Sequence, residues 1–321
     1  MIKTIIRRML ILIPQMIVLS LALFLMADAM PGDAIWGLAG PEASPEEVAA
    51  LIEAHGLDGP WYQQYISWVS NIIRGDFGRS LFHGRPVVDI INIRIRNTMW
   101  LSLFSTIFTL VIAIPFGIIA ARYVGKWQDR SILMYCFISS AVPAIALAIL
   151  SIWIFALILN WFPMGGTVDV LISPAETFRI LLSRLHHVML PSLVLAVVGN
   201  FGTIYTLRAQ IVDNSASAYV VTAKSKGVPT RTIYYKHIMR NSLIPFAQGL
   251  PFLIIGLVTG SIMIERIFSF HGMGDLFLSS IQVRDWPVVN AIAMFYGFLT
   301  IIGILSGDII LTLVDPRIKI K

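Results

Sequence analysis

The stretch Tyr219–Pro245, YVVTAKSKGVPTRTIYYKHIMRNSLIP, lies between two long apolar runs, and the interpretation of the whole chain depends on it. From Arg208 to the end of this stretch the chain is basic, and Asp213 is its only acid. The six Lys and Arg residues are Arg208, Lys224, Lys226, Arg231, Lys236 and Arg240. Helix-forming residues precede Gly227 and a proline follows soon after, so one helix should end at Gly227. Thr230 is a suitable N-cap for another helix, and the stretch therefore predicts a short helix-turn-helix at the membrane surface.

The composition of the chain indicates a polytopic membrane protein. Of its 321 residues 57% are apolar and only 13% are charged, whereas an ordinary soluble domain is about 25% charged. Six runs are long enough to cross a bilayer as helices, which takes about 20 apolar residues each. These runs are 9–29, 99–121, 132–161, 188–207, 243–264 and 288–314. We therefore predict an all-α fold with six transmembrane helices in one membrane domain, residues 1–321.

The distribution of positive charge predicts the orientation. The N-terminus, the loop 122–130, the segment 208–242 and the C-terminal tail hold fifteen of the 24 Lys and Arg residues and only three of the 18 Asp and Glu residues. The positive-inside rule therefore places both termini and the segment 208–242 in the cytoplasm, and residues 30–96 and 265–287 outside. A nucleic-acid-binding role has little support, because the positive charge is spread over four segments without an aromatic platform.

The two external segments are expected to contain helices of their own. In residues 30–96, Ser44-Pro45-Glu46-Glu47 forms a capping box and predicts a helix that stops at Gly56. Trp61 to Ile73 follows, with aromatic and apolar residues at helical spacing. Both helices are expected to form an external cap on the membrane face. Residues 265–287 combine a glycine-rich turn with a half-polar helix, which is typical of an interfacial or re-entrant element.

The sequence lacks the motifs of common catalytic sites. The only Gly-Lys pair, Gly125-Lys126, is followed by Trp127 where a P-loop needs Ser or Thr, so a nucleotide site of that type is excluded. His186 and His187 are adjacent in the sequence and would point to different faces of a helix. A pair of polar side chains at the interface therefore explains them better than a metal site. The single cysteine, Cys136, lies in an apolar run and is expected to be a small buried residue. We therefore expect no catalysis, metal or cofactor on this chain.

Three polar side chains fall inside the apolar runs: Asn200, Gln248 and Asp308. Polar groups at such positions often mark a substrate pathway, although Asn200 and Gln248 could instead bond across helices, at about 0.6 kcal/mol each. Asp308 lies near the end of the last run, where a structural contact with a loop arginine or a backbone group explains it better. A single buried acid is also too few for the proton relays that secondary carriers use.

The segment 208–242 is best explained as a docking surface, because a charge run that only fixed the topology would need no paired helices. Its pattern, Tyr219-x2-Thr222-Ala223-Lys224-Ser225-Lys226-Gly227 with His237-x2-Arg240-Asn241-Ser242-Leu243-x-Pro245, resembles the cytoplasmic loop of ATP-binding-cassette importer permeases. The resemblance is strongest to the B-type subunit of oligopeptide and dipeptide permeases. Further matches are Ile6-Arg7-Arg8, Pro31-Gly32-Asp33, Gly75-Asp76-Phe77-Gly78, Glu265-x-Ile267-Phe268, Arg284-Asp285 and Asp315-Pro316-Arg317-Ile318.

This resemblance implies a type I importer permease fold in which the loop between spans four and five forms a coupling helix against a separate ATPase subunit. The residues implied at that contact are Tyr219, Thr222, Ala223, Lys224, Lys226, Gly227, Arg240 and Asn241. The sequence departs from the family at Ala218, where an acid is common, and at Leu311, where a tyrosine is common. The residues implied in a pathway or gate are Asn200, Gln248, Glu265, Arg284 and Asp285.

The same resemblance implies the partners and the substrate. A second permease of similar fold, two ATPase subunits that bind ATP and Mg, and an extracytoplasmic substrate-binding protein would join this chain among the lipids of the cell membrane. ATP binding would drive alternating access, and a di- or oligopeptide is the expected substrate. Nickel chelates, glutathione and oligosaccharides are the alternatives within this class. A stand-alone carrier is the competing class, and an enzyme or receptor is disfavoured because no catalytic constellation is present.

Overall fold

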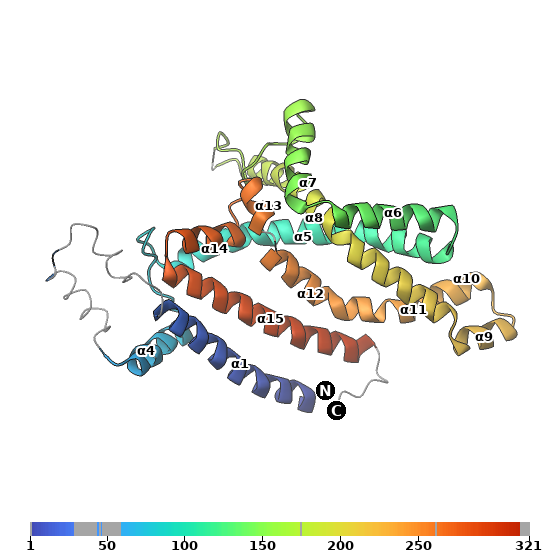
Figure 1. The fold of residues 1–321 in the computed structure, drawn as a ribbon, viewed down its shortest axis with the longest axis horizontal. Helices are drawn as coiled ribbons and strands as arrows, with labels where there is room; N and C mark the ends of the chain where they lie inside the picture. The colour runs from blue at the N-terminus through green and yellow to red at the C-terminus, as the bar shows by residue number, and fades with distance from the viewer. Residues whose placement is uncertain are drawn as a thin grey trace. The chain divides into compact units, whose positions relative to one another are not determined.

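The computed structural model describes residues 2–28, 44, 46, 59–173, 175–260 and 262–314 (Figure 1). Throughout these residues the regular structure is helical, apart from an isolated antiparallel bridge between Arg79 and Pro86. The predicted all-α class is confirmed. The capping box at 44–47 and the helix expected to end at Gly56 lie outside the described residues.

Contacts along the chain divide it into two compact units, and α5 (Val87–Arg122) and α15 (Trp286–Val314) contribute to both. Unit 1 comprises Thr98–His271 and Gly303–Lys321, and unit 2 comprises Ile2–Asn97 and Gly272–Ile302. Besides parts of α5 and α15, unit 1 contains α6 (Trp127–Ala141), α7 (Ala144–Ser151), the π-helix η1 (Ile152–Ile158), α8 (Thr177–Ser215), α9 (Ala218–Ser225), α10 (Thr230–Thr232), the π-helix η2 (Ile233–Ile238), α11 (Met239–Ser242), α12 (Ile244–Gly260) and α13 (Ile262–Ile267). Unit 2 contains α1 (Ile2–Asp28), α4 (Trp61–Ile73) and α14 (Met273–Gln282).

Three of the predicted spans lie in helices long and apolar enough to cross a membrane, namely α5, α8 and residues Trp286–Thr312 of α15. Two further predicted runs lie in shorter helical stretches, Leu10–Met26 within α1 and the 17-residue α12. The described helices thus support a multi-pass membrane protein, with three candidate spans or four if a bent pair counts as one. The count of six stays a prediction.

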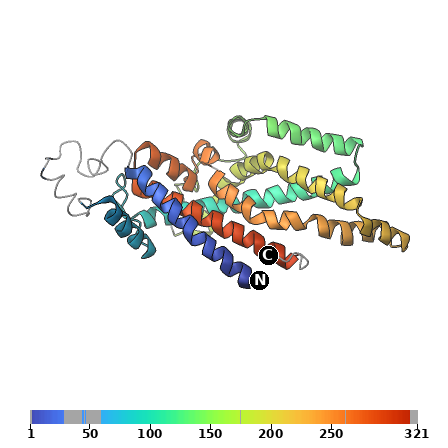
Figure 2. The same cartoon turned by 60° about the horizontal axis from the view of Figure 1, so that its bottom comes forward.

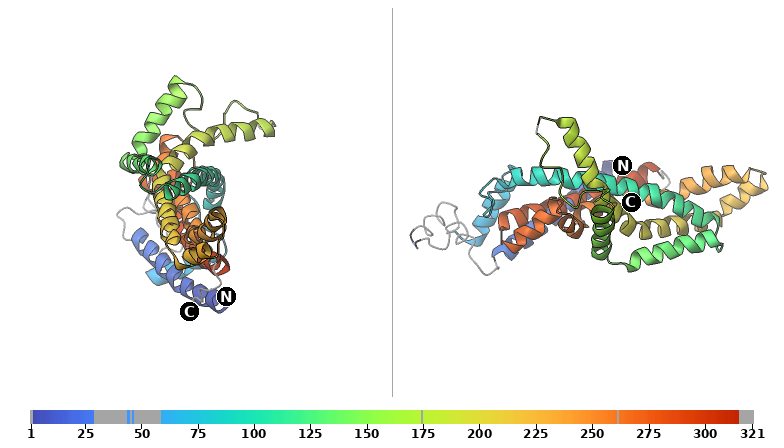
Figure 3. Two further views of the ribbon diagram at one scale, coloured as in Figure 1. Left: turned by 90° about the vertical axis from the view of Figure 1, so that its right-hand side faces the viewer. Right: turned by 90° about the horizontal axis from the view of Figure 1, so that it is seen from above.

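The bent pair is the predicted run 132–161, which does not form one straight helix. The helix α6 ends at Ala141, and the chain turns by 96° before α7 and η1 continue (Figure 3). The cause is local: Pro143 lacks an N–H and disfavours helical geometry at Val142, whose φ of −82° and ψ of 123° are extended. The predicted run therefore forms a helix broken at Val142-Pro143, and its assignment as one span stays a prediction.

One of the buried clusters of unit 1 forms where α5, α6 and α8 lie side by side (Figure 2). A buried cluster joins the three helices through Ala113, Ala120, Ile132, Cys136 and Ile204. Its residues are mostly small or β-branched, which lets the helices approach closely. The expectation that Cys136 is a small buried residue is confirmed, since its exposed fraction is 1%.

In unit 2 the helix α4 has the bounds predicted for it, Trp61–Ile73. Its aromatic residues pack on α1, where the ring of Phe24 lies 5.5 Å from that of Tyr65 and 6.0 Å from that of Trp68. The hydroxyls of Tyr65 and Ser20 share a hydrogen bond of 2.8 Å. The helical stripe seen in the sequence therefore faces another helix, while Trp61 stays exposed.

Candidate functional site

The first helix of the 208–242 segment ends as its sequence predicts. The helix α9 is closed by Gly227, whose φ of +72° is a left-handed conformation that favours glycine. The N–H of Gly227 donates to the carbonyl of Lys224 at 2.9 Å, and the N–H of Val228 donates to the carbonyl of Ala223 at 3.2 Å. These two bonds form a Schellman motif, which satisfies the last carbonyls of the helix and reverses the chain.

The second helix begins one residue earlier than its sequence suggests. The N-cap is Pro229, without a side-chain hydrogen bond, and Thr230 is the first residue of α10, so the prediction that Thr230 caps this helix is wrong. From Thr230 the helical path continues through η2 and α11 to Ser242. The π-helical middle is an arrangement that often occurs at functional sites.

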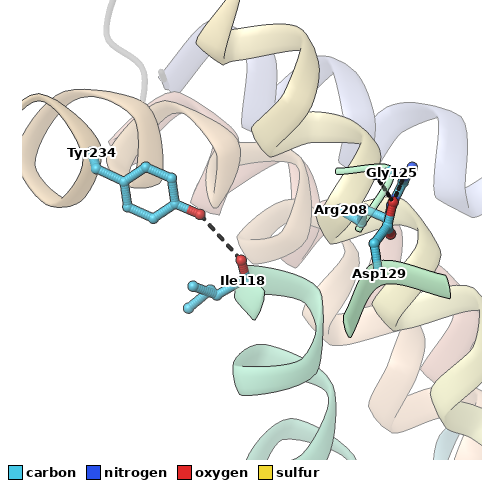
Figure 4. A network of polar contacts seen from close by, with 5 residues as sticks. All are labelled: Ile118, Gly125, Asp129, Arg208 and Tyr234. Atoms are coloured by element: carbon cyan, nitrogen blue, oxygen red, sulfur yellow. Dashed lines mark hydrogen bonds and ion pairs between the residues drawn. The ribbon is translucent and has the colours of Figure 1, made fainter. Parts of the chain in front are cut away.

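The two helices of the segment are held by apolar side chains and are not a loose charged loop. Leu207 and Ile211 of α8 pack with Val220, Ile233, Ile238 and Met239 of the segment, and Ile114 and Ile118 of α5 lie against them. The hydroxyl of Tyr234 donates to the carbonyl of Ile118 at 3.2 Å (Figure 4). The segment is therefore anchored on both α5 and α8.

An ion pair at the first residue of the segment joins α8 to the α5–α6 turn, residues 122–130 (Figure 4). Arg208 donates from Nε to Asp129 Oδ1 at 2.7 Å and from Nη2 to Oδ2 at 2.8 Å. The N–H of Gly125 donates to the same Oδ2 at 2.8 Å. Such a two-pronged contact fixes both the distance and the orientation of the two elements. The sequence assigned Arg208 to the docking surface, whereas the structure uses it for this internal contact.

The residues predicted to contact the ATPase divide between an outer and an inner face. Thr222, Lys224, Lys226, Gly227, Arg240 and Asn241 are exposed. Ala223 is partly buried against the apolar cluster, and Tyr219 donates its hydroxyl hydrogen to Asn214 Oδ1 at 3.1 Å. Tyr219 and Ala223 therefore hold α9 in place. The sequence interpretation missed two large exposed side chains, Val221 (59% exposed) and Tyr235 (54%). The sequence features that could have indicated them are the apolar residue before Thr222 and the second tyrosine after Tyr234.

The exposed residues of the second helix border a shallow hollow of about 400 Å³, lined by Arg231, Thr232, Tyr235 and Lys236. Two cations and an aromatic ring line this hollow. With Lys224, Lys226 and Arg240, which are also exposed, the segment presents five of its six basic residues outward. Such a surface fits an acidic partner with an apolar side chain to insert.

Three of the residues predicted for a pathway or gate belong to unit 1, namely Asn200, Gln248 and Glu265. Asn200 of α8 is fully buried, and its amide lies near the hydroxyl of Tyr135 without forming a hydrogen bond of normal geometry. Gln248 lies in α12, which passes close to Gly307 of α15. A Cβ added at Gly307 would lie 3.0 Å from the backbone carbonyl oxygen of Gln248. Glu265 is fully buried and accepts a hydrogen bond of 2.9 Å from the hydroxyl of Thr98. The roles predicted for these three residues in a pathway or gate stay predictions.

The other two predicted gate residues belong to unit 2. Asp285 is 1% exposed and accepts hydrogen bonds from the hydroxyl of Ser80 and from the N–H groups of Leu81 (3.0 Å) and Phe82 (3.4 Å). Its neighbour Arg284 is exposed and adopts a φ of +60°. Asp285 thus organises a turn, and its carboxylate is directed into the protein.

The histidine pair makes structural contacts. His186 Nε2 lies 2.8 Å from the carbonyl oxygen of Trp161, and His187 Nδ1 lies 2.8 Å from that of Ser183. Among the described residues no group of three or more His, Cys, Asp or Glu side chains could hold a metal ion.

Comparisons with known proteins agree with this architecture. Residues 113–320 match the family described as "Binding-protein-dependent transport system inner membrane component", and residues 1–102 match the model of its N-terminal region. The oligopeptide transport system permease protein AppB of Bacillus subtilis is 35% identical over 98% of both chains. The glutathione transport system permease protein GsiC of Escherichia coli is 33% identical over the full length of both.

A solved structure supports the fold. A chain of the MetNI methionine ABC transporter, described in inward-facing conformations, superimposes with a TM-score of 0.55 at 16% identity, covering 71% of this chain and 97% of that one. The family models and the two relatives confirm the resemblance to oligopeptide and dipeptide permeases. This chain belongs to the family of inner-membrane components of binding-protein-dependent transport systems.

Proposed function

We propose that this chain is the membrane-spanning permease subunit of an ATP-driven importer whose substrate is a di- or oligopeptide. The family and the relatives support the transport class, and the relatives are named for oligopeptides and for glutathione, which is itself a modified tripeptide. A peptide is therefore the chemistry that the two names share. Glutathione is the alternative substrate.

The observation that carries the coupling role is the anchoring of α9. An exposed row of Val221, Thr222, Lys224 and Lys226 stands on a helix whose other face is packed against α8 and η2. We place this row against a separate ATPase subunit, which would bind ATP and Mg. Closure of two such subunits would pull α9, and the buried cluster would pass the movement to α5 and α8. A second permease would complete the pathway, and a substrate-binding protein would deliver the peptide from outside.

The same proposal fixes the topology. The segment 208–242 and both termini face the cytoplasm, and the chain crosses the membrane six times. On the outer side lie residues 30–96, the loop around Val170 and residues 265–287. The uneven distribution of basic residues supports this orientation.

One cysteine-based experiment tests both coupling and topology, because Cys136→Ala alone removes the native thiol. In that background Ser225→Cys places a thiol on exposed α9, and Val170→Cys places the matched control on a loop where Val170 is 94% exposed. An impermeant maleimide added to intact cells should label position 170 and leave position 225 unlabelled until the cells are permeabilised. A short crosslinker should capture an ATPase through 225 and not through 170.

Labelling with the reverse sidedness would overturn the topology. Failure to capture an ATPase, together with uptake by the purified chain alone in liposomes, would replace the importer with a stand-alone carrier. The substrate is tested by uptake of labelled tri- and pentapeptides in the presence of excess glutathione. Peptide uptake that glutathione does not reduce supports the peptide assignment, and uptake of glutathione alone contradicts it.

A further inference from the structure

We propose that the α5–α6 turn, residues 122–130, binds the headgroup of an anionic phospholipid. Arg122, Lys126 and Arg130 are its three cations, and all are exposed. The only acid of the turn is Asp129, which is 2% exposed and forms an ion pair with Arg208. Because Arg208 neutralises Asp129 internally, the three surface charges have no acidic neighbour on the turn, and the turn presents a net positive surface.

Two of these cations are gathered around one aromatic ring. The guanidinium carbon of Arg122 and the ammonium nitrogen of Lys126 each lie 5.6 Å from the ring centroid of Tyr123. Cation–π contacts of this kind hold long, flexible side chains close to one place. A phosphodiester can accept hydrogen bonds from a guanidinium fork and from an ammonium group together. The ring thus keeps two cationic donors next to Tyr123, which favours an anionic headgroup at this place.

The surroundings of the turn match the depth of a membrane interface. Trp127 is 73% exposed and Val124 is 51% exposed, although both lie beside charged residues. Further along α6, Met134 and Phe137 are 59% and 68% exposed, as expected for side chains that face lipid tails. Trp and Tyr favour the level of the headgroups, and basic residues at that level are attracted to anionic lipids. The combination of exposed apolar side chains and cations favours lipid over an acidic protein surface.

The proposed lipid site lies on a different surface from α9, and lipid binding needs no ATPase. The proposal can therefore be tested independently of the coupling role. The test measures lipid binding to the full-length chain, purified in a neutral detergent, by native mass spectrometry during titration with phosphatidylglycerol or phosphatidylcholine. The test variant is Arg122→Gln/Lys126→Gln/Arg130→Gln. The matched control is Arg231→Gln/Lys236→Gln/Arg240→Gln, which removes three exposed cations from the neighbouring segment.

The unmodified chain should bind phosphatidylglycerol more tightly than phosphatidylcholine. A cation near an anionic surface contributes about fivefold in affinity, so the test variant should lose at least about tenfold for phosphatidylglycerol while the control changes little. Tyr123→Leu, which keeps the charges but removes the ring, should lose a part of that preference. Soluble glycerol phosphate should not compete, because it lacks the acyl chains that contact the exposed apolar side chains.

Equal losses in the test and control variants would overturn the proposal, because they would show unspecific attraction to a basic protein. An unchanged preference for phosphatidylglycerol in the test variant would also overturn it. If the test variant kept its lipid binding but lost a copurifying protein, the turn would be a protein-docking surface instead. Thermal unfolding of both variants in phosphatidylcholine checks that neither substitution has disrupted the fold.

Discussion

The ion pair between Asp129 and Arg208 makes the sharpest prediction about stability. Arg208→Met removes the guanidinium but keeps most of the apolar stem, so Asp129 stays buried with a side-chain exposure of 3%. Its carboxylate would keep the N–H of Gly125 but lose the two donors of Arg208. Breaking a buried pair by removing one partner typically costs 3–5 kcal/mol, and the 19% exposure of Arg208 favours the lower limit, about 3 kcal/mol.

The size of this effect comes from the charge left behind, so removal of that charge should restore stability. The double variant Asp129→Asn/Arg208→Met leaves a neutral amide that can still accept from Gly125, and we expect it to recover about half of the loss. The free energy of unfolding is measured in mixed micelles by titration with a denaturing detergent. The control is Arg179→Met, which breaks the pair of Arg179 and Glu176, where the side chains are 73% and 41% exposed. That change should cost less than about 0.5 kcal/mol.

Two results would refute this reasoning. If Arg208→Met costs no more than Arg179→Met, the pair between α8 and the turn contributes no more than a surface contact. If the double variant is less stable than Arg208→Met, the loss comes from missing hydrogen bonds and packing, and an unpaired charge on Asp129 does not explain it.

Three further predictions follow from the backbone and from buried polar groups. Gly227→Val places a β-branched residue at a φ of +72°, at a cost of at least about 1–2 kcal/mol. In the assembled importer it should lower the amount of substrate taken up per ATP hydrolysed. An unchanged ratio would contradict the coupling role. Gly165→Ala brings a Cβ to 2.5 Å from the backbone carbonyl oxygen of Phe268 and should lower the unfolding free energy by about 1–3 kcal/mol. Gly249→Ala, inside α12 and with open space around the new Cβ, should not destabilise the chain. Asp285→Asn weakens the acceptor of two backbone N–H groups, and hydrogen exchange at those amides should become faster.

Local rules were enough to predict several elements. The 3–4 spacing of aromatic residues gave the bounds of α4, because an amphipathic helix of this length has one face to bury. The end of α9 at Gly227 followed from the preference of glycine for a left-handed conformation. The apolar runs located α5, α8 and α15, because hydropathy sums over many residues and tolerates local irregularities.

Other features depend on partners that are distant in the sequence or on a competing local effect. The run 132–161 has the hydropathy of one span, but Pro143 overrides it locally and bends the helix by 96°. The predicted gate role of Asp285 stays a prediction, and the sequence did not show that its carboxylate contacts Ser80, 205 residues earlier in the chain. No periodicity or turn rule relates positions so far apart, and the structure was needed to find this contact.

The assignment of Arg208 shows why a count of charges could not identify the docking surface. In the sequence Arg208 and Lys224 are equivalent, because both add positive charge to the same cytoplasmic segment. In the structure Arg208 forms an ion pair with Asp129, the only acid of the 122–130 turn, whereas Lys224 is exposed. One internal pair thus has two consequences: it ties the turn to α8, and it keeps the only acid of the turn away from the turn's three cations. The proposed lipid site and the mechanical link from α8 to α6 therefore both depend on the carboxylate of Asp129.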